Sequence, residues 1–261
     1  MKSSLVLMKL GGSLITEKQR PNTFRPEYIG RIAKELAALR VDSDASDYII
    51  GTGAGSFGHF PAHKFGLREG ARGSRQVLGM GITHNAVQRL SLMAAESLTA
   101  AQLPAFVVSP SGLFVSNGKE VADMHLEPLR LLLEWGAIPI VHGDTVVDSV
   151  RGTTIFSTEK VLQVCLDYLR PFYPKVTVIY VMDADGLLDT NSVLIEELGL
   201  DDDIHVHDSL EHDVSGGIVS KVASARQAAK QADFVYLVSG RRPGAIAGVL
   251  AGKYVGTRVL G

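Results

Sequence analysis

Short, uninterrupted apolar runs recur along the chain, and most of them end at glycines or polar turn residues. They occupy residues 5–8, 48–50, 105–108, 138–141, 176–181 and 234–238. Runs of this length without polar alternation are typical of parallel strands that are buried on both faces of a sheet. Several of the segments between them place apolar residues every three or four positions, as on the buried side of a helix. The pattern predicts an α/β fold with a mainly parallel sheet.

The helical pattern is clearest at residues 26–39, where Pro26 suits the first turn, and at residues 76–101. Another helix is predicted to begin at Ser157-Thr158-Glu159, because hydroxyls cap helices and acids favour the first turn. Further helices are predicted at residues 126–135, 218–231 and 245–250, a β-hairpin at residues 146–156 and a last strand at residues 257–260. Residues 60–74 lack periodicity, and we expect a mobile segment near the functional site, with a lid as one interpretation.

Composition and charge narrow the class of protein. The 261 residues suffice for one large domain or for two lobes that share a sheet, and 46% of them are hydrophobic. The formal net charge is -2 and no block is rich in Lys or Arg, which argues against a general nucleic-acid binder. The single cysteine, Cys165, excludes an intrachain disulfide. No apolar run approaches the roughly 20 residues of a membrane span, and the N-terminal run is short for a signal sequence. We expect a cytoplasmic enzyme.

Candidate chemistry centres on a glycine-rich turn at residues 51–59, which reads Gly51-Thr52-Gly53-Ala54-Gly55-Ser56-Phe57-Gly58-His59. Glycines let main-chain N–H groups approach an anion closely, and the start of a helix adds its positive end. Similar turns occur at Lys9-Leu10-Gly11-Gly12-Ser13 and at Ser215-Gly216-Gly217. A lone turn of this kind would be an ordinary loop with a surface histidine. Three of them predict a site for a polyphosphate.

Charged side chains follow the same strand ends, where ligands gather in open α/β sheets. Lys9 and Lys221 are placed to meet phosphate oxygens, whereas Lys18 is a weaker candidate in a loop. Asp144 is either a turn aspartate or a carboxylate that orients the lysines, and we favour the second interpretation. The pair Asp183 and Asp185 could hold a metal, accept from a ribose or cap a turn.

Taken together, these motifs resemble the amino acid kinase superfamily, specifically the isopentenyl phosphate kinases. The resemblance rests on the two N-terminal glycine turns, on His142-Gly143-Asp144, on Asp183-Ala184-Asp185-Gly186 and on Asp213-Val214-Ser215-Gly216-Gly217 with Lys221, in order over nearly the whole chain. It implies a three-layer αβα sandwich with an N-terminal acceptor lobe, about residues 1–157, and a C-terminal nucleotide lobe, about residues 158–261. It also implies a homodimer, the cofactors ATP and Mg²⁺, and transfer of the γ-phosphoryl group to isopentenyl phosphate. A kinase for another phosphate or phosphonate, such as fosfomycin, is the alternative.

The resemblance also implies roles for particular residues. The catalytic set is His59, Lys9, Lys18 and Asp144, in which His59 holds the acceptor phosphate and Asp144 orients the lysines. The nucleotide is assigned to Lys9, Gly11, Gly12, Ser13, Gly55, Asp183, Gly186, Gly216 and Lys221. The acceptor is assigned to Gly53, Ala54, His59 and Thr158, and no residue is assigned to a metal.

Four residues depart from the pattern of that family. Thr158-Glu159 stand where Gly-Asp is usual, Thr52 stands where His is usual, and Met182 stands where Thr is usual. The first departure changes a main-chain contact and the length of a carboxylate side chain. A nucleotide-binding protein without catalysis is therefore a third hypothesis, although Lys9, Lys221 and His59 argue against it.

Overall fold

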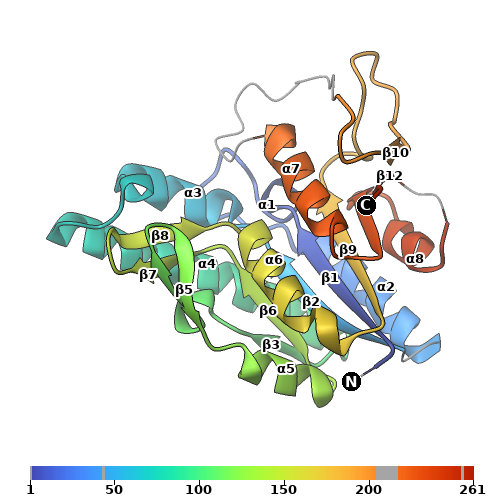
Figure 1. Cartoon of the computed structure of the whole chain (residues 1–261), viewed down its shortest axis with the longest axis horizontal. Coiled ribbons are helices and arrows are strands. Elements are labelled where there is room, and N and C mark those ends of the chain that lie inside the picture. Colours follow the sequence, from blue (N-terminus) through green and yellow to red (C-terminus); the bar gives the residue numbers. More distant parts are fainter. Residues whose placement is uncertain (1, 43–44, 204–216, 254–255) are drawn as a thin grey trace.

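The computed structural model describes residues 2–42, 45–203, 217–253 and 256–261, and in them helices cover both faces of a central sheet (Figure 1). Within the described residues this sheet has eight strands, in the order β10-β12-β11-β9-β1-β2-β6-β3. Neighbouring strands are parallel except for β11 and β12. The strands are β1 (Ser4–Leu10), β2 (Ser46–Thr52), β3 (Ala105–Val107), β6 (Ile138–His142), β9 (Lys175–Met182), β10 (Glu197–Leu198), β11 (Phe234–Ser239) and β12 (Thr257–Val259). The predicted three-layer α/β fold is confirmed.

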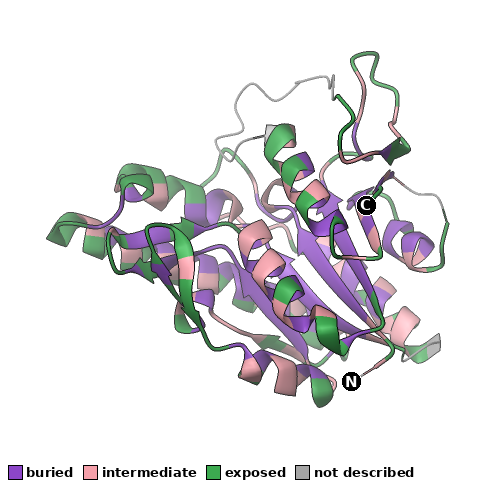
Figure 2. Cartoon of the chain, viewed as in Figure 1, coloured by how far each residue is buried: buried purple, intermediate pink, exposed green. Residues whose placement is uncertain are grey.

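Two hydrophobic cores lie on opposite faces of this sheet, because successive side chains of a strand point to opposite sides. In β1, Leu5 and Leu7 belong to one core, and Val6 and Met8 belong to the other. Figure 2 shows the sheet buried between the two helical layers. The first core is covered by α5 (Glu127–Glu134), α6 (Thr158–Leu169) and α7 (Gly217–Ala229). The second is covered by α1 (Gly12–Ile15), α2 (Pro26–Asp42), α3 (Gly55–Lys64), α4 (Ser74–Ala100) and α8 (Ala245–Leu250). Lys9 shares the alternation of Leu5 and Leu7, and it therefore faces α6.

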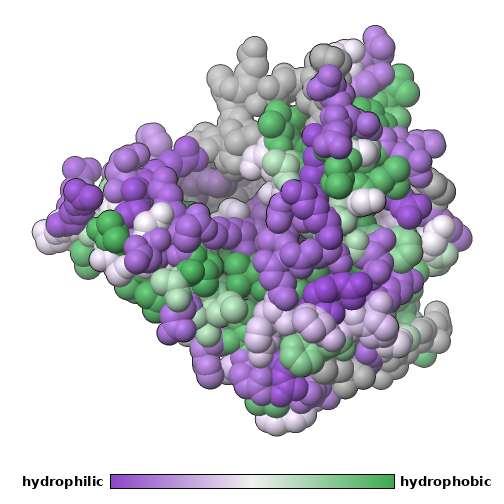
Figure 3. Space-filling model, in the orientation of Figure 1, coloured by the Kyte–Doolittle hydropathy of each residue, from purple (hydrophilic) through white to green (hydrophobic). Residues whose placement is uncertain are grey.

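A smaller sheet, in the order β5-β4-β7-β8, extends beside β6. Its strands are β4 (Phe114–Asn117), β5 (Glu120–Met124), β7 (Asp144–Asp148) and β8 (Gly152–Phe156). The hairpin predicted at residues 146–156 is confirmed as β7 and β8. The hairpin of β4 and β5 was not predicted. Figure 3 shows hydrophobic side chains gathered near this sheet on a face that is otherwise largely hydrophilic.

The buried carboxylate of Asp148 joins the turns of both hairpins. It accepts from the main-chain N–H groups of Gly118 and Lys119 in one turn, and of Val150 and Arg151 in the other, at 2.8 to 3.1 Å. Burial alone would raise the pKa of Asp148, but these donors hold the pKa below its usual value. The small sheet is therefore fixed by one side chain at its tip.

The segment from residue 60 to residue 74 packs against the same tip. It continues α3 to Lys64 and then forms the 3₁₀ turn η1 (Leu67–Glu69). The main-chain N–H of Ala71 donates to the carbonyl of Arg151 at 2.8 Å, and the Arg151 guanidinium donates to the carbonyl of Arg68 at 2.7 Å. The expected mobility of this segment stays a prediction.

Two further 3₁₀ turns are η2 (Pro110–Gly112) and η3 (Arg170–Phe172). The long helix predicted at residues 76–101 is confirmed as α4. None of the helices in the described ranges has the length and apolar content that a membrane span requires.

Candidate active site

The first two glycine turns touch main chain to main chain at the carboxyl ends of β1 and β2. The N–H of Gly53 donates to the carbonyl of Leu10 at 2.8 Å. A Cβ atom added to Gly12 would lie 2.6 Å from the nitrogen of Gly55, and one added to Gly53 would lie 2.5 Å from the nitrogen of Gly12. Both distances are too short for any side chain. The helices α1 and α3 begin at this contact, so their main-chain N–H groups face one small region, as an anion site requires.

Lys9 forms an ion pair with Glu159, the first-turn acid of α6. Burial alone would raise the pKa of Glu159, but the charges of Lys9 and Lys221 hold the pKa below its usual value. Lys9 is therefore paired with Glu159, and the charge of Lys221 adds a weaker effect on the same carboxylate. The contacts of Asp144 lie elsewhere, so the structure does not support the prediction that Asp144 orients the lysines.

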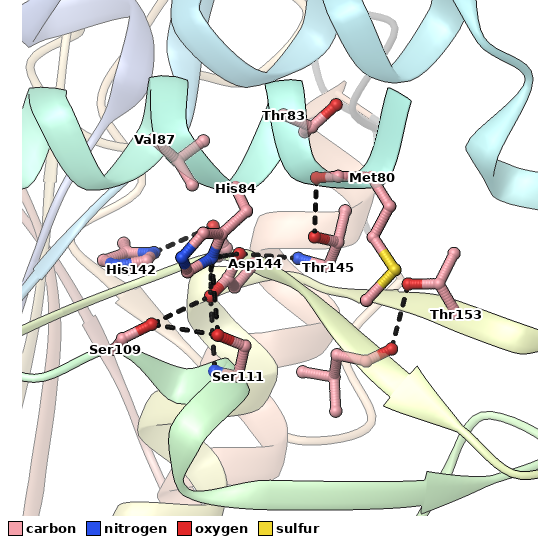
Figure 4. Close-up of polar contacts among 12 residues, drawn as sticks. Met80, Thr83, His84, Val87, Ser109, Ser111, His142, Asp144, Thr145 and Thr153 are labelled. Atoms are coloured by element: carbon pink, nitrogen blue, oxygen red, sulfur yellow. Dashed lines mark hydrogen bonds and ion pairs between the residues drawn. The ribbon is translucent and has the colours of Figure 1, made fainter. Parts of the chain in front are cut away.

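Asp144 lies instead at the centre of a hydrogen-bond network under α4 (Figure 4). Its carboxylate contacts Nδ1 of His84 at 3.0 Å and accepts from the hydroxyl of Ser109 at 3.3 Å. It also accepts from the main-chain N–H groups of Ser111 and Thr145 at 3.2 and 2.8 Å. The side chain of Asp144 is 0% exposed. This network holds α4 against the start of β7.

Thr158 is buried, and its hydroxyl forms hydrogen bonds with two main-chain groups. The hydroxyl donates to the carbonyl of Thr52 at 2.8 Å and accepts from the N–H of Gly143 at 2.9 Å. The side chain thus links the ends of β2 and β6. The predicted cap of α6 is confirmed, since the hydroxyl of Ser157 accepts from the N–H of Lys160 at 3.1 Å.

A second group of charged residues lines a cavity of about 260 Å³ on the α2 side of the glycine turns. It is lined by Ser13, Glu17, Lys18, Gln19, Arg25, Asp183 and Arg241. Arg241 donates to Asp183 at 2.5 Å. Ser13, Lys18 and Asp183, which we predicted separately, therefore share one cavity.

The remaining predicted residues lie near the glycine turns or at the end of β9. Ala54 is the residue that precedes α3, and His59 is exposed in that helix. Gly186 has a φ of 144°, and an added Cβ atom would lie 2.6 Å from Cδ1 of Leu194, so glycine is required there. Gly216 lies outside the described residues.

In the part of the chain that the structure describes, no group of three or more His, Cys, Asp or Glu side chains is arranged to hold a metal ion. Mg²⁺ in kinases is held largely by the phosphates of the nucleotide with one or two carboxylates, and Glu159 and Asp183 lie near the glycine turns and the cavity. The residues present therefore fit a metal that arrives with ATP.

The functional candidates that the sequence did not reveal are His84 and Glu159. The sequence indicated Glu159 as a first-turn acid and as a replacement of the usual Asp, but not as the partner of Lys9, although the alternation of β1 placed Lys9 on the side of Leu5 and Leu7. His84 is one polar residue of a long helix, and its partner lies 60 residues away. No local pattern predicts that pairing.

The comparisons with known proteins agree on one family. The model of the amino acid kinase family matches residues 4–239. An isopentenyl phosphate kinase of Methanothermobacter thermautotrophicus is 30% identical over 271 residues, which cover 98% of this chain and 99% of that protein. One of Arabidopsis thaliana is 30% identical over 220 residues, 75% of this chain and 65% of that protein. The T. acidophilum isopentenyl phosphate kinase product complex superimposes with a TM-score of 0.79 at 23% identity, covering 98% of this chain and 99% of that one, and thus shares the fold.

Proposed function

We infer that this chain, which belongs to the amino acid kinase family, catalyses the ATP-dependent phosphorylation of isopentenyl phosphate to isopentenyl diphosphate. The relative from Methanothermobacter thermautotrophicus, which carries that activity in its name, matches almost from end to end. The observation that carries the proposal is the contact between the turns at Gly12 and Gly53, beside Lys9. That contact provides main-chain donors for the phosphates of two substrates at one point.

On the nucleotide side, we assign the neutralisation of the polyphosphate to Lys9 and Lys221, with Gly12 and Gly55 as main-chain donors. The N–H of Gly11 already donates to the carbonyl of Val181 at 2.8 Å, so Gly11 contributes only close approach of the main chain. Phosphoryl transfer depends mainly on positioning and on stabilising charge, which two lysines can supply. Glu159 keeps the ammonium group of Lys9 near the glycine turns. Lys18, which lies in the cavity with Ser13, is assigned to the group being transferred.

On the acceptor side, an ionised oxygen of the acceptor phosphate attacks the γ-phosphorus, and the bond from that phosphorus to the oxygen of ADP breaks. The attacking oxygen carries no proton, so the reaction needs no general base. His59 is assigned to hold the acceptor phosphate by a hydrogen bond. Further main-chain donors are assigned to the residues after Gly53, whose own N–H donates to the carbonyl of Leu10.

Four finer statements belong to the same proposal. Mg²⁺ accompanies ATP and offsets phosphate charge when bound. Residues 1–157 form the acceptor lobe and residues 158–261 the nucleotide lobe. The protein is a homodimer. A cytoplasmic location is proposed as well, and each of these four rests on the resemblance or the composition of the sequence.

A panel of acceptors, assayed for ADP release with ATP and Mg²⁺, tests the function. Turnover of isopentenyl phosphate, with product of the expected mass, is the expected result. Turnover of fosfomycin alone would assign the chain to the alternative kinase class. Binding of ATP without turnover of any acceptor would assign it to a nucleotide-binding protein that lacks catalysis.

A further inference from the structure

Three contacts tie the underside of α4 to the strand ends below it. From the C-terminal to the N-terminal side of α4 they join Ser91 to Thr52, His84 to Asp144 and Met80 to Thr145, at 2.8, 3.0 and 3.2 Å. An α-helix rises about 1.5 Å per residue, so these contacts span about 16 Å. His84 lies in the middle of that span.

The acceptor turn lies against the same stretch of α4. Thr52 directly precedes Gly53, and a Cβ atom added to Gly58 in α3 would lie 2.9 Å from Cγ1 of Val87 in α4. Val87 is three residues from His84, which is nearly one helical turn. His84 therefore lies about one helical turn along α4 from the residue that contacts α3, the helix that follows the acceptor turn.

The contacts of His84 leave a defined edge of its ring for a ligand. Nδ1 lies against the Asp144 carboxylate and 3.3 Å from the hydroxyl of Ser111, on the buried side. The side chain of His84 is 28% exposed, whereas that of Asp144 is 0% exposed. The exposed edge therefore carries Nε2, for which no hydrogen bond occurs within the described residues.

The neighbouring polar side chains are not placed to bind a ligand in this way. The hydroxyls of Thr83, Thr145 and Thr153 each donate to a main-chain carbonyl, at 2.8, 3.2 and 2.9 Å. His142 is fully buried beside Asp144, and burial lowers its pKa. His84 is thus the group of this network that contacts Asp144 and is also partly exposed.

We propose that Asp144 positions His84 and that His84 binds the phosphate group of the acceptor through Nε2, beside the turn that starts at Gly53. Asp144 is then a positioning residue, which acts only through His84. The inference rests on the proposed function for the identity of the acceptor. It predicts recognition of the phosphate and not of the hydrocarbon tail.

The test compares His84→Asn and Asp144→Asn with Asn85→Ala, an exposed neighbour on the same helix that serves as the control. The amide nitrogen of asparagine takes the place of Nδ1 and can still donate to Asp144, whereas nothing takes the place of Nε2, so His84→Asn keeps the fold even if His84→Ala does not. A hydrogen bond to a charged group contributes enough to change affinity by about 10-fold or more. We expect the acceptor KM to rise by about that factor in both variants, with the KM for ATP unchanged and kcat within about threefold. The double variant is expected to lose no more than either single variant, because both act through one contact.

Alkyl phosphates of different chain length complete the test, together with calorimetric binding of each acceptor without ATP. An equal loss for every chain length supports a contact to the phosphate. A loss that grows with chain length, or an unchanged acceptor KM in folded His84→Asn, would overturn the proposal. If the wild-type protein does not use isopentenyl phosphate, the proposed function fails. The role of His84 is then decided by the ratio of the acceptor KM in each variant to that in wild type, measured with the phosphate monoester that the protein does use.

Discussion

Two largely buried carboxylates stand at the ligand edge of the sheet, and their surroundings differ. Asp144, on the α4 side, is held by three neutral donors and by His84. Glu159, on the α6 side, depends on Lys9 and Lys221, the two lysines assigned to the nucleotide. Asp144 is held mainly by donors that belong to the fold, whereas the partners of Glu159 are lysines that the proposed function assigns to the nucleotide. A strand-end carboxylate therefore cannot be assigned a role from its position alone.

The largest expected effect on activity follows removal of the Lys9 ammonium group, which pairs with Glu159 and is assigned to the nucleotide. Lys9→Ala is expected to lower kcat by on the order of 10²–10³, as for loss of one electrostatic donor to a transition state. It also leaves Glu159 without its ion-pair partner, so the free energy of unfolding falls as well. Steady-state rates with isopentenyl phosphate and urea unfolding measure the two effects. A fully active Lys9→Ala variant would remove Lys9 from the nucleotide site.

A second prediction concerns the side chain between the two carboxylates. Thr158 precedes Glu159, and its hydroxyl accepts from the N–H of Gly143, which precedes Asp144. Thr158→Gly leaves two buried main-chain groups without this partner, which costs roughly 1–3 kcal/mol for each unsatisfied group. Although Gly is usual in the family here, we expect a clear fall in Tm for this chain, and Thr158→Ser should recover most of it. An unchanged Tm in Thr158→Gly would mean that water replaces the hydroxyl.

The third prediction uses pH to separate the contribution of the Glu159 charge to stability from the contribution of its uncharged packing. The folded state lowers the pKa of Glu159, so ionisation of this carboxyl contributes stability above its ordinary pKa of 4.5. That contribution is lost as the pH falls through the lower pKa of the folded state. Wild-type protein should therefore exceed Glu159→Gln in unfolding free energy at pH 7, and the difference should shrink at acid pH. A difference that does not vary with pH would contradict the ion pair.

The smallest effect is expected at the most exposed carboxylate contact of the site. Arg241 pairs with Asp183, but its side chain is 57% exposed, and such pairs contribute about 1 kcal/mol or less. Arg241→Ala should leave the unfolding free energy nearly unchanged in denaturant titrations. A loss as large as that of Thr158→Gly would show that Arg241 does more than pair with Asp183.

Much of the fold was predictable because its signals are local. The buried strands, the long helix α4 and the cap at Ser157 each depend on residues close in sequence. The hairpin of β4 and β5 had a signal as well, since Asn117-Gly118 is a strong turn dipeptide, and Gly118 and Lys119 both have positive φ.

The partners within the site were less predictable. Lys9 and Glu159 are 150 residues apart, and His84 and Asp144 are 60 apart, so each pairing depends on how helices pack on the sheet. The sequence identified which residue types gather at the strand ends. It did not identify which carboxylate meets which cation, because both carboxylates follow the same kind of strand.

The main-chain contact between Gly12 and the turn at Gly53–Gly55 has a consequence for adaptation. Since every side chain is excluded there, substitution at these glycines would separate the two turns and change the phosphate site itself. The distance between the two phosphates is thus not open to gradual adjustment by side-chain size. A change of acceptor during evolution would have to arise in walls built from side chains, such as α4 and the β7–β8 hairpin, while the transfer chemistry stays constant.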